Sequence, residues 1–110
     1  MSLKVFVIGS GAREEAIRSA VLKSPLCEKI VYSLDENPDL IIFGPEQPIC
    51  DGLVDLYRAK GFNCIGVSKN FSQLESSKIT AKMFMANNGI KCAKLLPIEY
   101  PKFPQVVKMD

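Results

Sequence analysis

Short runs of apolar residues alternate with segments of helical periodicity along this chain. Continuous apolar runs predict strands over Lys4–Ile8, Lys29–Leu34 and Leu40–Phe43, and Cys64–Val67 predicts a shorter fourth strand. Runs that are apolar at successive positions are typical of parallel strands covered on both faces. The pattern therefore favours a mostly parallel sheet rather than one with a solvated face.

Helical periodicity predicts helices over Arg13–Lys23, Asp51–Lys60 and Ser72–Asn88. Ser72–Glu75 has the form of a capping box, so we expect the third helix to begin there. The first helix is expected to turn four apolar residues to the core: Ala16, Ile17, Ala20 and Val21. Strands alternating with helices predict an α/β fold with three layers, a Rossmann-like sheet with flanking helices.

The second and third predicted strands lie unusually close together in the sequence. Only the turn-like residues Asp35–Asp39 separate them, whereas a parallel crossover normally needs a dozen or more residues. Either the two strands form an antiparallel hairpin, or residues that belong between them are missing. Because both runs are continuously apolar, we favour parallel strands and a missing segment.

Composition narrows the chemistry that the chain can carry. It has 110 residues, a formal net charge of +2 and no long run of basic residues, which argues against nucleic acid as a partner. No apolar run approaches the length of a membrane span. Four cysteines without a Cys-x-x-Cys pair are typical of small apolar residues in a reducing compartment. The absence of histidine removes the commonest general base.

The first strand runs into a glycine turn, Gly9-Ser10-Gly11, at the start of a helix. Such a turn binds anions, because backbone N–H groups are unpaired there and the helix dipole adds positive charge. A dinucleotide fingerprint needs a third glycine where this chain has Glu14, although Asp35 stands where a ribose-binding acid belongs. Arg13 can add a forked contact, which suits a phosphate monoester better than a pyrophosphate.

A second turn, Gly44-Pro45-Glu46, follows the third strand. Ligands of parallel α/β sheets lie beyond the carboxyl ends of the strands, so both turns are expected to form walls of one site. The Glu46 carboxylate could accept hydrogen bonds from ribose hydroxyl groups or from an amine, although an exposed loop glutamate is an equal alternative.

Three stretches together resemble glycinamide ribonucleotide synthetase, also called phosphoribosylamine–glycine ligase. They are Lys4–Ala16, Pro38–Pro48 with Gly52–Asp55 after it, and Gln73–Met85, which leads to Asn88-Gly89-Ile90. Val106–Asp110 is similar to the first strand of that family's ATP-grasp region. The resemblance covers most of the chain in the family's order.

The resemblance implies an ATP-dependent ligase of purine biosynthesis that joins 5-phosphoribosylamine and glycine, with Mg²⁺. This chain corresponds to the pre-ATP-grasp domain, which helps to bind the phosphoribosyl substrate. The implied substrate-binding residues are Ser10, Gly11, Ala12, Arg13, Glu14, Glu46 and Pro48. Lys108 matches the lysine that contacts the phosphates of ATP. No catalytic or metal-binding residue is expected in this piece, which alone is expected to be inactive. The resemblance also implies a cytoplasmic protein that has no membrane or nucleic-acid partner, and a monomer is favoured.

The resemblance also divides the chain. Residues 1–96 correspond to the phosphoribosyl-substrate domain, with one more short strand expected over Ile90–Leu96, and 97–110 to a linker and the first ATP-grasp strand. Ala12 and Glu15 stand where the family usually has glycine and histidine. The family also has a longer segment between the second and third strands. Three alternatives stay open: an NAD(P)-binding Rossmann domain, a carboxylase-type ATP-grasp relative and a non-catalytic remnant.

Overall fold

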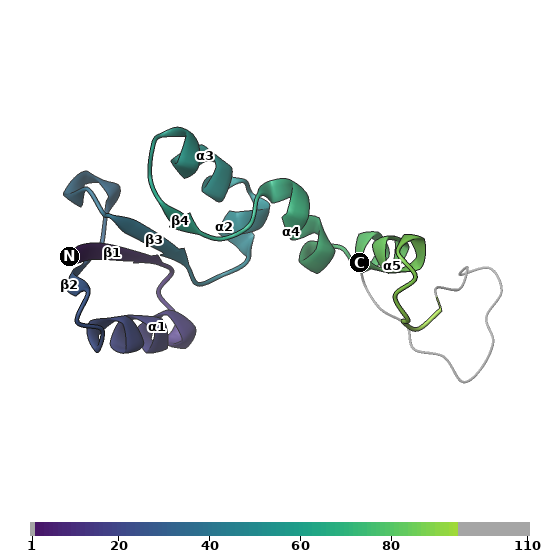
Figure 1. The fold of residues 1–110 in the computed structure, drawn as a ribbon, viewed down its shortest axis with the longest axis horizontal. Helices are drawn as coiled ribbons and strands as arrows, with labels where there is room; N and C mark the ends of the chain where they lie inside the picture. Colours follow the sequence, from purple (N-terminus) through teal and green to yellow (C-terminus); the bar gives the residue numbers. More distant parts are fainter. Residues whose placement is uncertain (1, 95–110) are drawn as a thin grey trace. The chain divides into compact units, whose positions relative to one another are not determined.

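A four-stranded parallel sheet forms the centre of the fold (Figure 1). The computed structural model describes residues 2–94. The strands are β1 (Leu3–Ile8), β2 (Cys27–Val31), β3 (Leu40–Phe43) and β4 (Cys64–Ile65), in the order β2-β1-β3-β4. The predicted α/β class and parallel sheet are confirmed.

Helices cover the sheet on both faces. Helix α1 (Ala12–Leu22) follows β1 and packs on β1 and β2, whereas α2 (Gln47–Cys50) and α3 (Leu53–Ala59) follow β3. Figure 1 shows α1 below the sheet and α3 above it. The three predicted layers are therefore present. Two further helices, α4 (Lys69–Ser76) and α5 (Lys78–Asn87), follow β4, and the chain divides into two compact units after Asn70.

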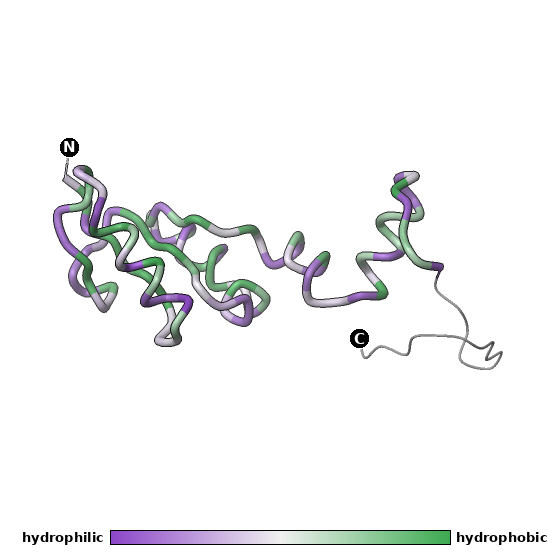
Figure 2. Tube along the Cα trace, turned by 90° about the horizontal axis from the view of Figure 1, so that it is seen from below, coloured by the Kyte–Doolittle hydropathy of each residue, from purple (hydrophilic) through white to green (hydrophobic). Residues whose placement is uncertain are grey.

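The core of the first unit lies between the sheet and α3. Ile41 and Val54 are fully buried there, and Phe43 joins them. The ring of Tyr57 stacks on Phe43 with 6.2 Å between the centroids. On β1, Val5 and Val7 point to the opposite face and are also buried. Figure 2 shows the apolar character concentrated along the strands, as expected for a sheet covered on both sides.

The strands that flank the β2–β3 link have the parallel arrangement that the sequence favoured. Both strands pair with β1 in parallel, on opposite sides of it, so the hairpin alternative is wrong. Residues 32–39 suffice because the strands are staggered: Val31 is level with Phe6, and Leu40 is level with Val5. The link crosses one strand, roughly 10 Å at the usual strand spacing, and does not return along a full strand. It contains a 3₁₀ turn, Leu34–Glu36.

The predicted helix over Ser72–Asn88 is two helices, because Ser77 has an extended backbone and its Oγ accepts the Thr80 N–H at 3.1 Å. The predicted capping box at Ser72 is wrong, since Ser72 is buried inside α4. The helix predicted over Asp51–Lys60 is confirmed as α3, which begins after Gly52, whose φ is +89°, and the short helix α2 before it was not predicted. The described part of the predicted strand over Ile90–Leu96, up to Lys94, is not a strand.

Candidate functional site

The order of the strands creates a switch point between β1 and β3. From β1 the chain passes through α1 to β2 on one side, and β3 continues through α2 and α3 to β4 on the other. The helices leave opposite faces at this point, and ligands of parallel α/β sheets bind at the carboxyl ends of strands next to such a point. The turns Gly9–Gly11 and Gly44–Glu46 meet here, and the Gly44 N–H donates to the Ile8 carbonyl at 3.1 Å. The two turns predicted as site walls are therefore neighbours.

Arg13 joins the two turns. Its Nη1 donates to the Gly44 carbonyl at 2.9 Å and lies 3.5 Å from an Oε atom of Glu46. The Arg13 and Glu46 side chains are 64% and 59% exposed, so this ion pair is solvated. Exposed pairs of this kind contribute little to stability. The guanidinium can therefore turn toward a ligand at small cost.

Glu14 lies between the same two turns but is buried, with 5% of its surface exposed. Its carboxylate accepts the Gly11 N–H at 2.7 Å, which is one half of a capping box. A Cβ on Gly9 would lie 2.5 Å from the Glu14 Cγ, and a Cβ on Gly44 2.4 Å from it. These two glycines leave the room that the glutamate side chain occupies.

Arg18 corrects the predicted inner face of the first helix. Ala16 and Ala20 are exposed, whereas Arg18 is buried. Its Nη2 donates to the Val7 carbonyl at 3.0 Å and to the Gly9 carbonyl, and its Nη1 pairs with Glu15 at 2.6 Å. Its Nε has no partner among the described residues.

The guanidinium of Arg18 also lies over the ring of Tyr32, 5.5 Å from its centroid. The inward stripe of α1 thus carries two charged residues that bind backbone groups of the segment joining β1 to α1. Sequence analysis missed Arg18, although its spacing of four from Glu14 places both on one helix face.

The other predicted residues occupy different positions around the two turns. Ser10 and Ala12 are exposed, and Pro48 is half-buried in the first turn of α2. Among the described residues, no acceptor takes the backbone N–H groups of Ala12 and Arg13, the first two residues of α1. Lys108 lies outside the described residues.

Glu46 directly precedes α2, and its exposed side chain lies beside Arg13. A hydrogen bond from its own backbone, together with the hydrogen bond and charge of Arg13, lowers the pKa of Glu46 below its usual value. The carboxylate therefore stays ionised near neutral pH and can accept hydrogen bonds from hydroxyl or ammonium groups.

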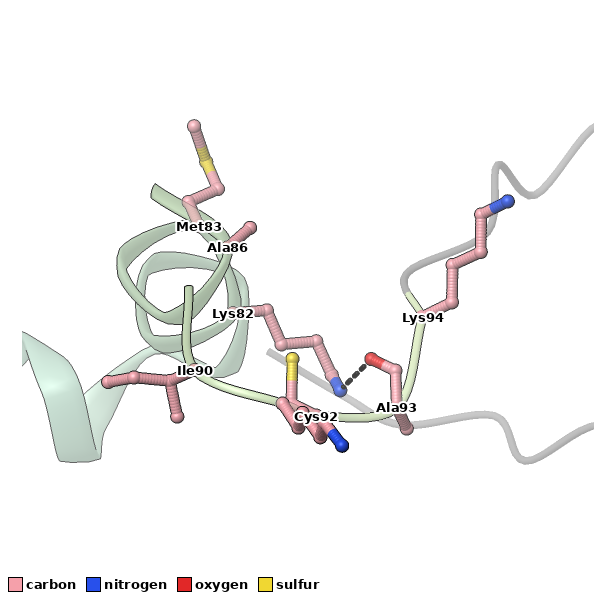
Figure 3. Close-up of a pocket in the computed structure, with 8 residues that line it drawn as sticks. Lys82, Met83, Ala86, Ile90, Cys92, Ala93 and Lys94 are labelled. Carbon is pink, nitrogen blue, oxygen red and sulfur yellow. Dashed lines mark hydrogen bonds between the residues drawn. The ribbon is translucent and has the colours of Figure 1, made fainter. Parts of the chain in front are cut away.

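Residues 2–94 contain no group of three acidic, histidine or cysteine side chains able to hold a metal ion. None of the described helices is both long and apolar enough to cross a membrane. A shallow pocket on the second unit is lined by Met83, Ala86 and Ile90, and Lys82 at its edge donates to the Ala93 carbonyl at 2.8 Å (Figure 3). None of the predicted site residues lines it.

Comparison with known proteins gives a consistent result. The profile of the family described as "Phosphoribosylglycinamide synthetase, N domain" matches residues 31–75. A phosphoribosylamine–glycine ligase from Pseudomonas putida is 32% identical over 132 residues, which cover 94% of this chain. The enzyme of the same name from Ralstonia nicotianae is 36% identical over 84% of this chain. A bifunctional purine biosynthetic protein from Dictyostelium discoideum is 31% identical over 94%.

The match covers only part of these relatives: 30% of the Pseudomonas protein, 28% of the Ralstonia protein and 16% of the Dictyostelium protein. The stretch of 132 residues matched in the first is longer than this chain of 110, so that relative has residues inside the match that this chain lacks. Residues 31–75 thus match the phosphoribosylglycinamide synthetase N domain, and most of the chain is similar to part of the phosphoribosylamine–glycine ligases.

Proposed function

We propose that this chain is the phosphoribosyl-binding part of an ATP-dependent ligase that joins 5-phosphoribosylamine and glycine in purine biosynthesis. The relatives are named as ligases of this substrate pair. The observation that supports a role for this piece is the meeting of the two turns at the switch point, with Arg13 between them.

The proposed substrate lies across both turns. Its phosphate accepts the N–H groups of Ala12 and Arg13, where the helix dipole and the Arg13 guanidinium both favour negative charge. The Gly11 N–H bonds Glu14 and is not part of this contact. The ribosyl end lies toward Glu46, whose ionised carboxylate accepts hydrogen bonds from hydroxyl or amine groups. In this proposal Ser10 lies beside the phosphate end of the substrate, and Pro48 lies beside its ribosyl end.

The chemistry of the ligase is proposed for the longer protein. ATP and Mg²⁺ supply acyl-phosphate activation of glycine, and Lys108 is proposed to contact ATP. The described residues offer no carboxylate cluster for a metal, so no step is assigned to them. The proposal also includes small-molecule substrates and a monomeric protein in the cytoplasm. Its free cysteines are typical of such a reducing compartment.

Calorimetric titration with ribose 5-phosphate tests the binding role. The wild-type chain is expected to bind, and Arg13→Ala to weaken binding roughly tenfold or more through loss of charge-assisted hydrogen bonds. Lys23→Ala removes the same charge from the opposite end of α1 and is expected to change affinity less than about twofold. Absence of binding by the wild-type chain, or equal losses in both variants, would contradict the proposal.

A further inference from the structure

Glu14 occupies the position that distinguishes this glycine turn from a dinucleotide-binding turn. In the dinucleotide fingerprint the second glycine lets the backbone approach the pyrophosphate, and the third lets helix and strand pack closely. Here the second glycine is Gly11, and Glu14 stands in place of the third. The structure allows the consequence of that exchange to be followed atom by atom.

The first consequence is steric. The Glu14 side chain is buried against Gly9 and Gly44, so close that a methyl group on either would lie within 2.5 Å of its Cγ. A Cβ on Gly11 would lie 2.9 Å from its Oε2. The side chain therefore fills the space between the two turns, beside the backbone of the second glycine.

The second consequence is chemical. The Gly11 N–H, which the fingerprint directs at a pyrophosphate, donates instead to the Glu14 carboxylate at 2.7 Å. A phosphate at that point would lose this donor and would meet a like charge at contact distance, which is strongly unfavourable where water is excluded. One and two residues further along the backbone, the N–H groups of Ala12 and Arg13 stay open to one phosphate group.

We propose that Glu14 is a specificity-determining residue, which restricts the turn to a single phosphate group and excludes ligands bridged by a diphosphate. This inference deepens the proposed function and rests on its assignment of phosphate binding to this turn. It names the ligand class as phosphate monoesters. It also gives a physical reason against the dinucleotide alternative.

The test compares ribose 5-phosphate with ADP-ribose, which carries a diphosphate bridge. Binding of each is measured by calorimetry on the wild-type chain, Glu14→Gly and Glu14→Ala. Both variants free the Gly11 N–H and the space beside it, so ADP-ribose affinity is expected to rise about tenfold or more relative to ribose 5-phosphate. Glu14→Ala retains helix propensity and decides the question if the glycine variant does not fold.

Two controls help to separate the effect of the Glu14 charge from the effect of the space that its side chain fills. Glu15→Gly places the same glycine one residue later at an exposed position, and it is expected to leave the ligand ratio unchanged. Glu14→Gln removes the charge but keeps the volume and an oxygen acceptor for the Gly11 N–H, so ADP-ribose affinity is expected to rise less than in Glu14→Gly and Glu14→Ala.

The inference is overturned if neither Glu14→Gly nor Glu14→Ala shifts the ratio beyond the Glu15→Gly control. It is also overturned if wild-type chain binds ADP-ribose as tightly as ribose 5-phosphate. A wild-type chain that binds no ribose 5-phosphate contradicts the proposed function, yet the gain of ADP-ribose binding in the Glu14 variants still decides this point.

Discussion

The two turns at the carboxyl edge of the sheet are held in opposite ways. The first, Gly9–Gly11, is fixed from inside by the buried side chains of Glu14 and Arg18, which bond its backbone N–H and carbonyl groups. The second, Gly44–Glu46, is held from outside by the exposed guanidinium of Arg13. A buried polar network is costly to break, whereas an exposed ion pair exchanges readily with water or ligand. We infer a rigid first turn and an adjustable contact across to the second.

The strongest test of the rigid turn is Gly9→Ala. The φ of Gly9 is +117°, and the added Cβ would meet Glu14 at 2.5 Å, so strain and overpacking combine. We expect a loss of about 3 kcal/mol in the free energy of unfolding, measured by urea denaturation. Gly61→Ala is the matched control, because Gly61 also has positive φ (+93°) but open space around it. That variant is expected to lose about 1 kcal/mol in the free energy of unfolding. Equal losses in the two variants would show that the contact with Glu14 adds nothing to the cost at Gly9.

Arg18→Met tests the second buried contact. The change leaves the Val7 and Gly9 carbonyls without their donor and is expected to cost about 2 kcal/mol in chemical denaturation. Arg58 makes the same type of contact, donating to the Cys64 and Gly66 carbonyls, but from an exposed position. Arg58→Met is therefore expected to cost about 1 kcal/mol or less. A larger loss at Arg58 than at Arg18 would reverse the assignment of the rigid region.

Arg13→Ala is expected to separate stability from binding. Because its ion pair with Glu46 is solvated, the free energy of unfolding should change by less than about 0.5 kcal/mol. The same variant is expected to show the loss of ribose 5-phosphate affinity described above. A stability loss comparable to that of Arg18→Met would show that the second turn is also structurally fixed.

The smallest effect concerns pH. The folded-state pKa of Glu46 is lowered, so its contribution to stability is present above the unfolded pKa and is lost as pH falls through the folded value, below about 4.5. Arg13→Ala should move the NMR titration midpoint of Glu46 upward. It should not restore the ordinary value, because the backbone hydrogen bond is the larger cause. An unchanged midpoint would mean that Arg13 does not contact Glu46 in solution.

The sequence predicts those parts of the fold in which burial is visible as a continuous run of apolar residues. The apolar runs that ended at Ile8 and Phe43 gave two strands with nearly correct bounds, since a strand covered on both faces is apolar at every position. The meeting of the two turns followed from the same parallel order. The helix break at Ser77 was missed, because one residue of extended backbone leaves the apolar spacing almost intact.

The inner face of α1 could not be predicted from hydropathy. Glu14 and Arg18 are charged, and they are buried because the N-cap of α1 presents the Gly11 N–H and the end of β1 presents two carbonyl groups to them. Those partners exist once the strand and helix have packed. The sequence likewise could not show how so short a link joins the parallel strands β2 and β3, because the stagger of the strands along β1 is a tertiary property.

The central claim is that the open N–H groups at the start of α1 bind one phosphate group. An NMR titration of the ¹⁵N-labelled chain with ribose 5-phosphate tests it most directly. The account predicts saturable shifts that are largest at the amides of Ala12 and Arg13, with a smaller shift at Gly11, whose N–H stays bonded to Glu14. Largest shifts elsewhere, or no saturable shift at either amide, would contradict it.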